Sequence, residues 1–258
     1  MSERIRFLAV GHVTNDVIGG RVMAGGSALY AALAARALGC DARILTSAGP
    51  DWVGEASVPM TVRAAERTTT FEHVYTGGRR RSWLRATAEP IDEEVDADVV
   101  FLCPVAGEVG PRCFRRGAGT RVVGAGLQGW LRATGPGGEV VPRALPPLAG
   151  ADAWFASAED VAAPPDLPGI VAWTAGEAGA DVRVGGAWHH VRAYPTTAID
   201  PTGAGDVFAA AFLVAWARGE PPLRAAAIGA CAASIAVEGE GVTAITNLHG
   251  LAERLRTY

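Results

Sequence analysis

The first fifty residues contain apolar runs of different lengths, separated by short polar or glycine-rich segments. The run over residues 5–10 is short and continuous and stops at Gly11, which is the pattern of a buried strand. The alanine-rich run over residues 28–38 ends before Gly39 and predicts a helix. Residues 42–46 are again strand-like. This order of strand, helix and strand indicates a parallel sheet in an α/β protein.

Polar and small residues mark the ends of these elements. Residues 12–16 predict a polar loop after the first strand, and Ser27 has the chemistry of an N-cap for the helix. Farther along, the β-rich runs within residues 68–86 flank Thr76-Gly77-Gly78 and predict a hairpin. A hairpin inserted in a parallel α/β chain is typical of a lid or an edge ribbon, and a second one is predicted about Gly185-Gly186.

Outside these hairpins the α/β pattern resumes. A Gly/Pro-rich stretch over residues 124–147 is interpreted as a long loop that faces a site. Strands are predicted near 99–102, 121–123, 153–155 and 170–173, and helices over 205–217, 223–237 and 248–256.

The amino-acid composition excludes several catalytic mechanisms. All 23 basic residues among the 258 are arginine, and no lysine occurs. This excludes a Walker-A phosphate loop, a pyridoxal Schiff base and Ser-x-x-Lys acyl transfer, each of which needs a lysine. The net charge of −4 provides no global positive field, so we expect no nucleic-acid partner and interpret Arg79-Arg80-Arg81 as a local feature.

The cysteines and the apolar runs bear on the compartment. Four cysteines without C-x-x-C spacing indicate a reduced, cytoplasmic chain without a zinc site. The apolar run near the N-terminus is too short for a signal sequence, and no run approaches the roughly 18 residues of a membrane span. We therefore expect no membrane partner.

The most informative stretch runs over residues 199–213. Gly203, Ala204 and Gly205 allow backbone N–H groups to turn inward where a long apolar helix begins, which predicts an anion cradle at the positive helix end. Asp206 stands at the same place. From the residues alone it is either a helix cap or a general base that faces a substrate hydroxyl in phosphoryl transfer.

Several motifs together resemble one family. Asp200-Pro-Thr-Gly-Ala-Gly-Asp206 resembles the D-T-x-G-A-G-D signature of the ribokinase-like (PfkB) carbohydrate kinases. The segments 11–16 and 25–39 resemble the family's N-terminal G-x-x-x-x-D and G-G-x-x-x-N regions, and 174–179 resembles its T-x-G-x-x-G. The resemblance spans nearly the whole chain and follows family order. It implies a three-layer α/β/α sandwich with a small β-hairpin lid, the core comprising residues 1–13, 24–66 and 92–258 and the lid 14–23 and 67–91.

The resemblance also implies roles for individual residues. Asp206 would be the catalytic base, and the amides of Gly203, Ala204, Gly205 and Asp206 the anion hole. ATP and Mg²⁺ would be the co-substrate and cofactor, with Thr174, Gly176 and Gly179 contacting ATP together with Thr202, Gly203 and Gly205. Asp200 and Thr202 match positions that hold a monovalent cation such as K⁺ in many relatives. Acceptor binding would involve Asp16, Asn15, Gly25, Gly26, Ser27 and Asp206.

The chain departs from the family pattern at several positions. Tyr30 replaces the asparagine of G-G-x-x-x-N, so a usual polyol contact is missing or replaced by a phenol. The N-x-x-E motif that organises Mg²⁺ through water is present only loosely, as Ser157 with Asp160 or Ala156 with Glu159, and the serine register is favoured. The short region 51–67 indicates a trimmed helix before the lid.

Other features point to a branch of the family. Gln128-Gly-Trp-Leu-Arg132, together with 105–108 and 157–160, resembles the myo-inositol-kinase-like branch, although Gly126 replaces an aspartate. Gln128, Tyr30 and Arg85 are candidate acceptor contacts, and Trp83 and Trp130 are a candidate apolar wall or core residues. The expected function is an ATP-dependent kinase for a sugar or cyclitol. A nucleoside kinase or a catalytically weak binding or regulatory protein stays open, and the lid edge favours a homodimer.

Overall fold

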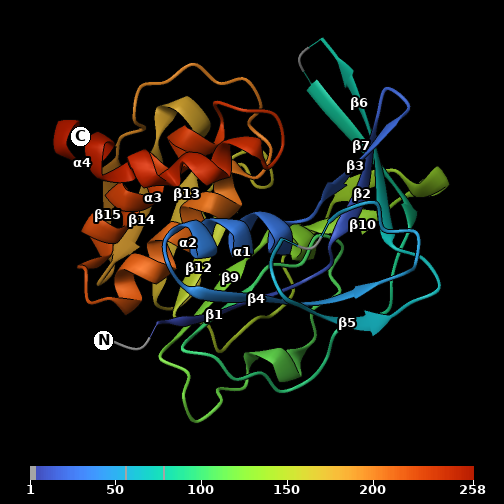
Figure 1. Cartoon of the computed structure of the whole chain (residues 1–258), viewed down its shortest axis with the longest axis horizontal. Coiled ribbons are helices and arrows are strands. Elements are labelled where there is room, and N and C mark those ends of the chain that lie inside the picture. Colours follow the sequence, from blue (N-terminus) through green and yellow to red (C-terminus); the bar gives the residue numbers. More distant parts are fainter. Residues whose placement is uncertain (1–3, 56, 78) are drawn as a thin grey trace.

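A computed structural model describes residues 4–55, 57–77 and 79–258. Its centre is a nine-stranded sheet in the order β15-β14-β13-β12-β9-β8-β1-β4-β5 (Figure 1). The strands from β13 to β5 run parallel, whereas β14 and β15 form an antiparallel hairpin at one edge. Their bounds are β1 Arg6–Val10, β4 Asp41–Ala48, β5 Met60–Ala64, β8 Val99–Leu102, β9 Val122–Gly126, β12 Ala153–Ser157, β13 Ile170–Thr174, β14 Ala180–Val184 and β15 Ala187–Val191.

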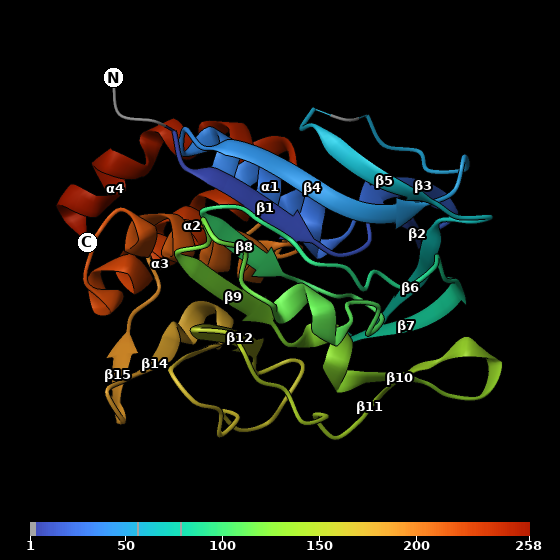
Figure 2. The ribbon, with the colours of Figure 1, turned by 90° about the horizontal axis from the view of Figure 1, so that it is seen from below.

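The α-helices that the structure describes pack on one face of this sheet (Figure 2). Phe155 meets Phe212 edge to face, with ring centroids 5.4 Å apart, a geometry that aromatic pairs favour. Alanines line the buried side of α1 and α2, so these helices lie close to the strands. The helices are α1 Ser27–Ala37, α2 Ala204–Ala217, α3 Pro222–Ala236 and α4 Leu251–Thr257, the last preceded by the 3-10 segment η5 Thr243–Gly250.

The other face of the sheet has a different cover. Trp154, Ile91 and Leu127 are fully buried there, beneath loops and short 3-10 turns. In the described ranges this layer contains no α-helix, so one outer layer of the expected sandwich is irregular in this chain. The turns on this side are η1 Pro111–Phe114, η2 Gln128–Leu131 and η3 Pro136–Gly138.

A second, four-stranded sheet forms the lid, in the order β3-β2-β6-β7. It projects from the end of the large sheet at which the parallel strands finish (Figures 1 and 2). A short ribbon of β10 (Arg132–Thr134) and β11 (Val140–Pro142) lies beside it, joined by a bridge between Trp83 and Glu139. The lid strands are β2 Thr14–Ile18, β3 Arg21–Gly25, β6 Thr69–Thr76 and β7 Arg79–Ala86.

Three local predictions from the sequence are wrong. The expected polar loop becomes strand β2 from Thr14 onward, because its backbone pairs with β3 and β6. Strand β5 lies in the region where a trimmed helix is expected, and its described residues contain no helix. Gly26, with φ of 101°, is the N-cap of α1 in place of Ser27, which begins the helix. Gly78 of the predicted hairpin turn lies outside the described residues.

Candidate active site

The start of helix α2 lies beside the carboxyl ends of the central strands. Gly203 is its N-cap with φ of 77°, a left-handed conformation that favours glycine. The amide of Ala204 donates to Pro201 O at 3.2 Å, so this member of the predicted anion hole is engaged in a turn. In the described part of the chain the amides of Gly205 and Asp206 have no protein acceptor outside the helix. A Cβ at Gly205 would meet nothing within 4 Å, so an anion has room to approach these amides.

Asp206 is in the first turn of α2 and partly buried. Burial raises the pKa of this carboxyl to about 7, and the charge of Asp160 acts in the same direction. A hydrogen bond with the Ser27 hydroxyl and the charge of Arg132 oppose the shift and lower the pKa. A carboxyl that titrates near neutral pH is suited to accept a proton from an alcohol.

Asp16 reaches the same region from the lid. Thr14 Oγ1 donates to its Oδ1 at 2.9 Å. A Cβ at Gly25 would fall 2.1 Å from Asp16 Oδ2, so only glycine leaves room for this carboxylate. At Gly26 a Cβ would lie 2.4 Å from His12 O. The two glycines therefore let the lid carboxylate and the start of α1 approach each other closely.

Tyr30 packs its ring directly against the anion cradle. A Cβ at Gly203 would fall 2.0 Å from Tyr30 Cδ1, so the tyrosine occupies the space beneath the N-cap of α2. Burial raises the pKa of the phenol well above its usual range, and the carboxylates of Asp200, Asp16 and Asp206 add to the shift. The phenol is therefore neutral and close to all three acids.

Arg132 supplies positive charge opposite Asp206. Its Nη2 lies 3.5 Å from Asp160 Oδ1, and the two side chains are 19% and 10% exposed. Ser157 Oγ donates to Asp160 Oδ2 at 2.8 Å. Burial lowers the pKa of Arg132, and the neighbouring Arg80 lowers it further, whereas Asp160, Asp206 and Asp16 raise it. The charges of Arg80, Asp160, Asp206 and Asp16 therefore all act on the Arg132 guanidinium.

The two registers of the loose Mg²⁺ motif have different surroundings. Ser157 and Asp160 lie together in the site, whereas Glu159 is 80% exposed and faces Arg80 of the lid at 3.8 Å. Clusters of three or more metal-ligating His, Cys, Asp or Glu side chains do not occur in residues 4–55, 57–77 and 79–258. A magnesium ion would therefore have to take ligands from water and phosphate as well as from Asp160.

Asp200 ties together the loops before α2 and after α3. Its Oδ1 accepts from Thr202 N and its Oδ2 from Gly241 N, both at 2.9 Å. The carboxylate therefore organises the backbone at the predicted cation site. Each oxygen keeps a lone pair for a cation.

The predicted ATP contacts lie at the end of β13 and in the following turn, η4 Gly176–Ala178. Thr174 Oγ1 donates to Ala156 O at 3.3 Å, next to Ser157 in the neighbouring strand. Gly176 and Gly179 have φ of 56° and 93°. A Cβ at Gly179 would lie 2.3 Å from Val191 O, so this glycine is required for the turn to pack on β15.

Several predicted acceptor contacts have other partners. In the side chain of Asn15, Nδ2 donates to Asp51 O at 2.9 Å and Oδ1 accepts from Val53 N at 3.1 Å. The residue is only 4% exposed. Arg85 pairs with Glu72 at 2.6 Å and donates to Gly137 O. Arg81 and Arg85 both stack over Trp83, whereas Trp130 is buried in the core. Gln128 begins η2 after β9 and is partly exposed.

The prediction did not place Arg132, Arg80, His12 or Glu108 among the site residues. Glu108 is 4% exposed and accepts from the amides of His12, Val105 and Ala106. His12 is fully buried, with Nε2 2.9 Å from Glu89 O and Nδ1 2.7 Å from Thr69 Oγ1. These hydrogen bonds hold the segment that connects β1 to the lid strand β2. Arg132 had a signal in the Gln-Gly-x-x-Arg stretch, whereas the contacts of His12 have no local signature.

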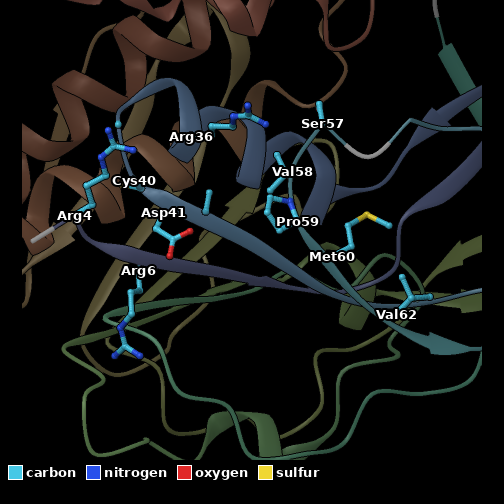
Figure 3. Close-up of a pocket in the computed structure, with 12 residues that line it drawn as sticks. Arg4, Arg6, Arg36, Cys40, Asp41, Ser57, Val58, Pro59, Met60 and Val62 are labelled. Atoms are coloured by element: carbon cyan, nitrogen blue, oxygen red, sulfur yellow. The ribbon is translucent and has the colours of Figure 1, made fainter.

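A surface cavity of about 1190 Å³ lies away from this site (Figure 3). It is lined by residues at the amino ends of β1 and β4, including Arg6 and Asp41, and by Met60 of β5. Asp206 and Asp16 lie at the opposite ends of the strands, so this cavity takes no part in the candidate site. Among the described residues no helix is both long and apolar enough to cross a membrane.

Comparisons with known proteins agree with the fold. Residues 153–248 match the model of the pfkB family carbohydrate kinase. A pyrophosphate-dependent kinase in the ribokinase family, complexed with a pyrophosphate analog and myo-inositol, has a similar structure with a TM-score of 0.78 at 22% identity, covering 98% of this chain and 100% of that one. The structure of Arabidopsis thaliana ribokinase complexed with ribose and ATP has a TM-score of 0.75 at 17% sequence identity. The match covers 98% of this chain and 99% of that one. The Methanocaldococcus jannaschii nucleoside kinase has a TM-score of 0.71 at 17% sequence identity, and the match covers 100% of both chains. No curated protein matches the sequence.

Proposed function

For a chain that has the ribokinase fold and whose residues 153–248 match the pfkB carbohydrate kinases, we propose that it transfers a phosphoryl group to a hydroxyl of a sugar or cyclitol. The observation that carries this proposal is Asp206, a carboxyl with a pKa near 7 in the first turn of a helix whose amides are open to an anion. A base and an anion cradle at one place suit in-line phosphoryl transfer to an alcohol.

The proposed reaction uses these groups in turn. Asp16 holds the acceptor, and Asp206 takes the proton of one acceptor hydroxyl as its oxygen attacks the terminal phosphorus of the donor. The new P–O bond forms as the bond to the leaving phosphate breaks. The amides of Gly205 and Asp206, with Arg132, stabilise the charge on the phosphoryl oxygens. Mg²⁺ bound with the donor would neutralise phosphate charge, and Ser157 and Asp160 offer oxygen ligands for it.

The donor expected from the sequence motifs is ATP, bound near Thr174, Gly176 and Gly179. Inorganic pyrophosphate is a second candidate. Two observations favour it: the charge of Arg80 lowers the pKa of Arg132, so two guanidinium charges act in the same region, and a solved structure similar to this chain is that of a pyrophosphate-dependent kinase. We also propose that Asp200 and Thr202 bind a monovalent cation such as K⁺.

A screen of donors against acceptors tests the function. Each of ATP and pyrophosphate is incubated with myo-inositol, other cyclitols, hexoses, pentoses and nucleosides, with Mg²⁺ and with or without K⁺, and donor consumption is measured. We expect turnover with a cyclitol or sugar. Turnover restricted to nucleosides would favour the nucleoside kinase, and no turnover with any pair would favour a binding or regulatory protein.

A further inference from the structure

The lid presents one face to the candidate site. Side chains alternate along its strands, so residues paired across β2, β6 and β7 share a face. The face of Asp16 also carries His73 and Tyr75 of β6 and Arg80 and Ser82 of β7. Asp16 and Tyr75 both influence the pKa of Tyr30 in the core, so this face turns towards the anion cradle. The opposite face carries Glu72, Val74, Trp83 and the outward arginines Arg81 and Arg85.

His73 lies beside the proposed acceptor ligand Asp16. The two side chains are 11% and 16% exposed, and His73 Nε2 lies 3.8 Å from Asp16 Oδ1. On the other side of the ring, Nδ1 lies 2.8 Å from Ser82 Oγ. The ring also stacks on Phe71, with centroids 6.0 Å apart and planes inclined by 13°. Serine, phenylalanine and the lid backbone therefore fix the orientation of the imidazole.

Electrostatics determines which nitrogen carries the proton. A lone pair on Nε2 aimed at a carboxylate would be repelled, whereas an Nε2–H is attracted. This arrangement favours the tautomer with the hydrogen on Nε2, in which Ser82 Oγ–H donates to Nδ1. The separation of 3.8 Å is too long for a direct hydrogen bond between Nε2 and Asp16. Thus Asp16 offers an acceptor and His73 an unsatisfied donor, side by side on the site-facing surface.

We propose that His73 is a second acceptor-binding residue, which donates from Nε2 to a hydroxyl oxygen next to the hydroxyl that Asp16 accepts. The pair then recognises two hydroxyls on adjacent carbons, and this assigns the substrate class as polyols with a vicinal diol. The inference rests on the proposed kinase function. Ser82 is a positioning residue, because it acts through the orientation and tautomer of His73.

The experiment combines lid variants with acceptors that lack one hydroxyl. Wild type, His73→Ala, His73→Gln and Ser82→Ala are assayed with myo-inositol and its monodeoxy analogues, and with D-ribose and 2-deoxyribose. Val74→Thr is the matched control, since Val74 is adjacent in the same strand, 42% exposed and on the opposite face. Melting temperatures show whether each variant folds.

For the wild type we expect one deoxy analogue to lose about 10-fold in kcat/KM, as for the loss of one hydrogen bond. In His73→Ala, kcat/KM for the intact acceptor should fall by about the same factor, whereas kcat/KM for that deoxy analogue should hardly change. The donor KM should stay within about twofold of the wild-type value. His73→Gln should retain part of the discrimination through its amide, Ser82→Ala should lose part of it, and Val74→Thr should match the wild type.

Equal losses for intact and deoxy acceptors, or a change confined to the donor KM, would overturn the role of His73 while leaving kinase activity established. Absence of wild-type turnover with every acceptor would instead contradict the proposed function. If His73→Ala fails to fold, the same comparison is decided by His73→Gln and Ser82→Ala, of which at least one must reduce the discrimination.

Discussion

At the scale of single residues, the motif around Asp206 was predictable because its chemistry is contiguous in the sequence. A glycine at the N-cap, a small residue in the first turn and a carboxylate follow one another at the start of an apolar helix. The resemblance favoured a base over a cap, and a pKa raised by burial suits the proposed base. The contacts of His73 join distant segments, so no local pattern revealed them, whereas Arg132 stands in the Gln-Gly-x-x-Arg stretch but its contact with Asp160 was not predicted.

Replacing Asp206 by asparagine should reduce kcat by at least about 10³-fold with little change in donor KM, because the residue acts on the acceptor proton. The acceptor and donor KM are measured together with kcat in steady state. A variant that keeps most of the wild-type turnover would show that another group takes the proton.

The same substitution should change stability in a pH-dependent way. Folding raises the pKa of Asp206 from 3.8 to about 7, so its stabilising contribution is full below pH 3.8 and is lost as the pH rises through about 7. Above that pH the ionised carboxylate costs on the order of 4 kcal/mol. Asp206→Asn should therefore raise Tm at pH 8 more than at pH 5. An equal change in Tm at both values would contradict the raised pKa.

Arg132 lowers and Asp160 raises the pKa of Asp206. The pH dependence of kcat/KM should therefore change when either neighbour is replaced. The acidic limb of kcat/KM should lie near pH 7 in the wild type. Arg132→Gln should move it to higher pH and Asp160→Asn to lower pH. A limb that stays in place in both variants would mean that it does not report Asp206.

At the scale of elements, the strands and helices with strong periodicity were predicted within a few residues, including β8, β13 and α2. Strand β2 was not, because polar side chains occupy most of it. Its stability comes from its place between β3 and β6 and from Asn15, which anchors the loop at Asp51 and Val53. Those partners are brought together only by the tertiary structure.

Removal of the Asn15 anchor separates a structural from a binding role. Asn15→Ala leaves backbone groups of Asp51 and Val53 without their partner and should cost about 1–3 kcal/mol of unfolding free energy. Denaturant unfolding measures this loss, and acceptor KM for the folded fraction should remain close to the wild-type value. A large rise in acceptor KM without loss of stability would restore the predicted role of Asn15 as an acceptor ligand.

At the scale of the whole molecule, the order of the motifs predicted the ribokinase-like fold, which is confirmed by similar structures that cover nearly the whole chain. A long loop over residues 124–147 was predicted, but the replacement of helices by loops and 3-10 turns over the second sheet face was not. Their buried residues, such as Trp154 and Leu127, are apolar as helix-covered residues would be, so the sequence pattern does not distinguish the two kinds of cover.

The sequence predicts a homodimer through the lid edge, and we propose that exposed valines on the outer face of the lid contribute to such an interface. Val22 and Val74 share this face and are 49% and 42% exposed. Changing both to lysine should shift a dimer towards monomer, because like charges would meet across a twofold interface. Light scattering after size exclusion measures the mass, and a wild-type monomer at high concentration would contradict the dimer.

We propose that Asp206 is the base in phosphoryl transfer to an alcohol, and ³¹P NMR follows that transfer directly. Wild type and Asp206→Asn are each incubated with the acceptor panel and with ATP or pyrophosphate, and the spectrum is followed for a new phosphomonoester resonance. We expect this resonance in the wild type, with loss of the donor signal, and its near absence with Asp206→Asn. No phosphomonoester with any acceptor, or equal formation by both proteins, would contradict it.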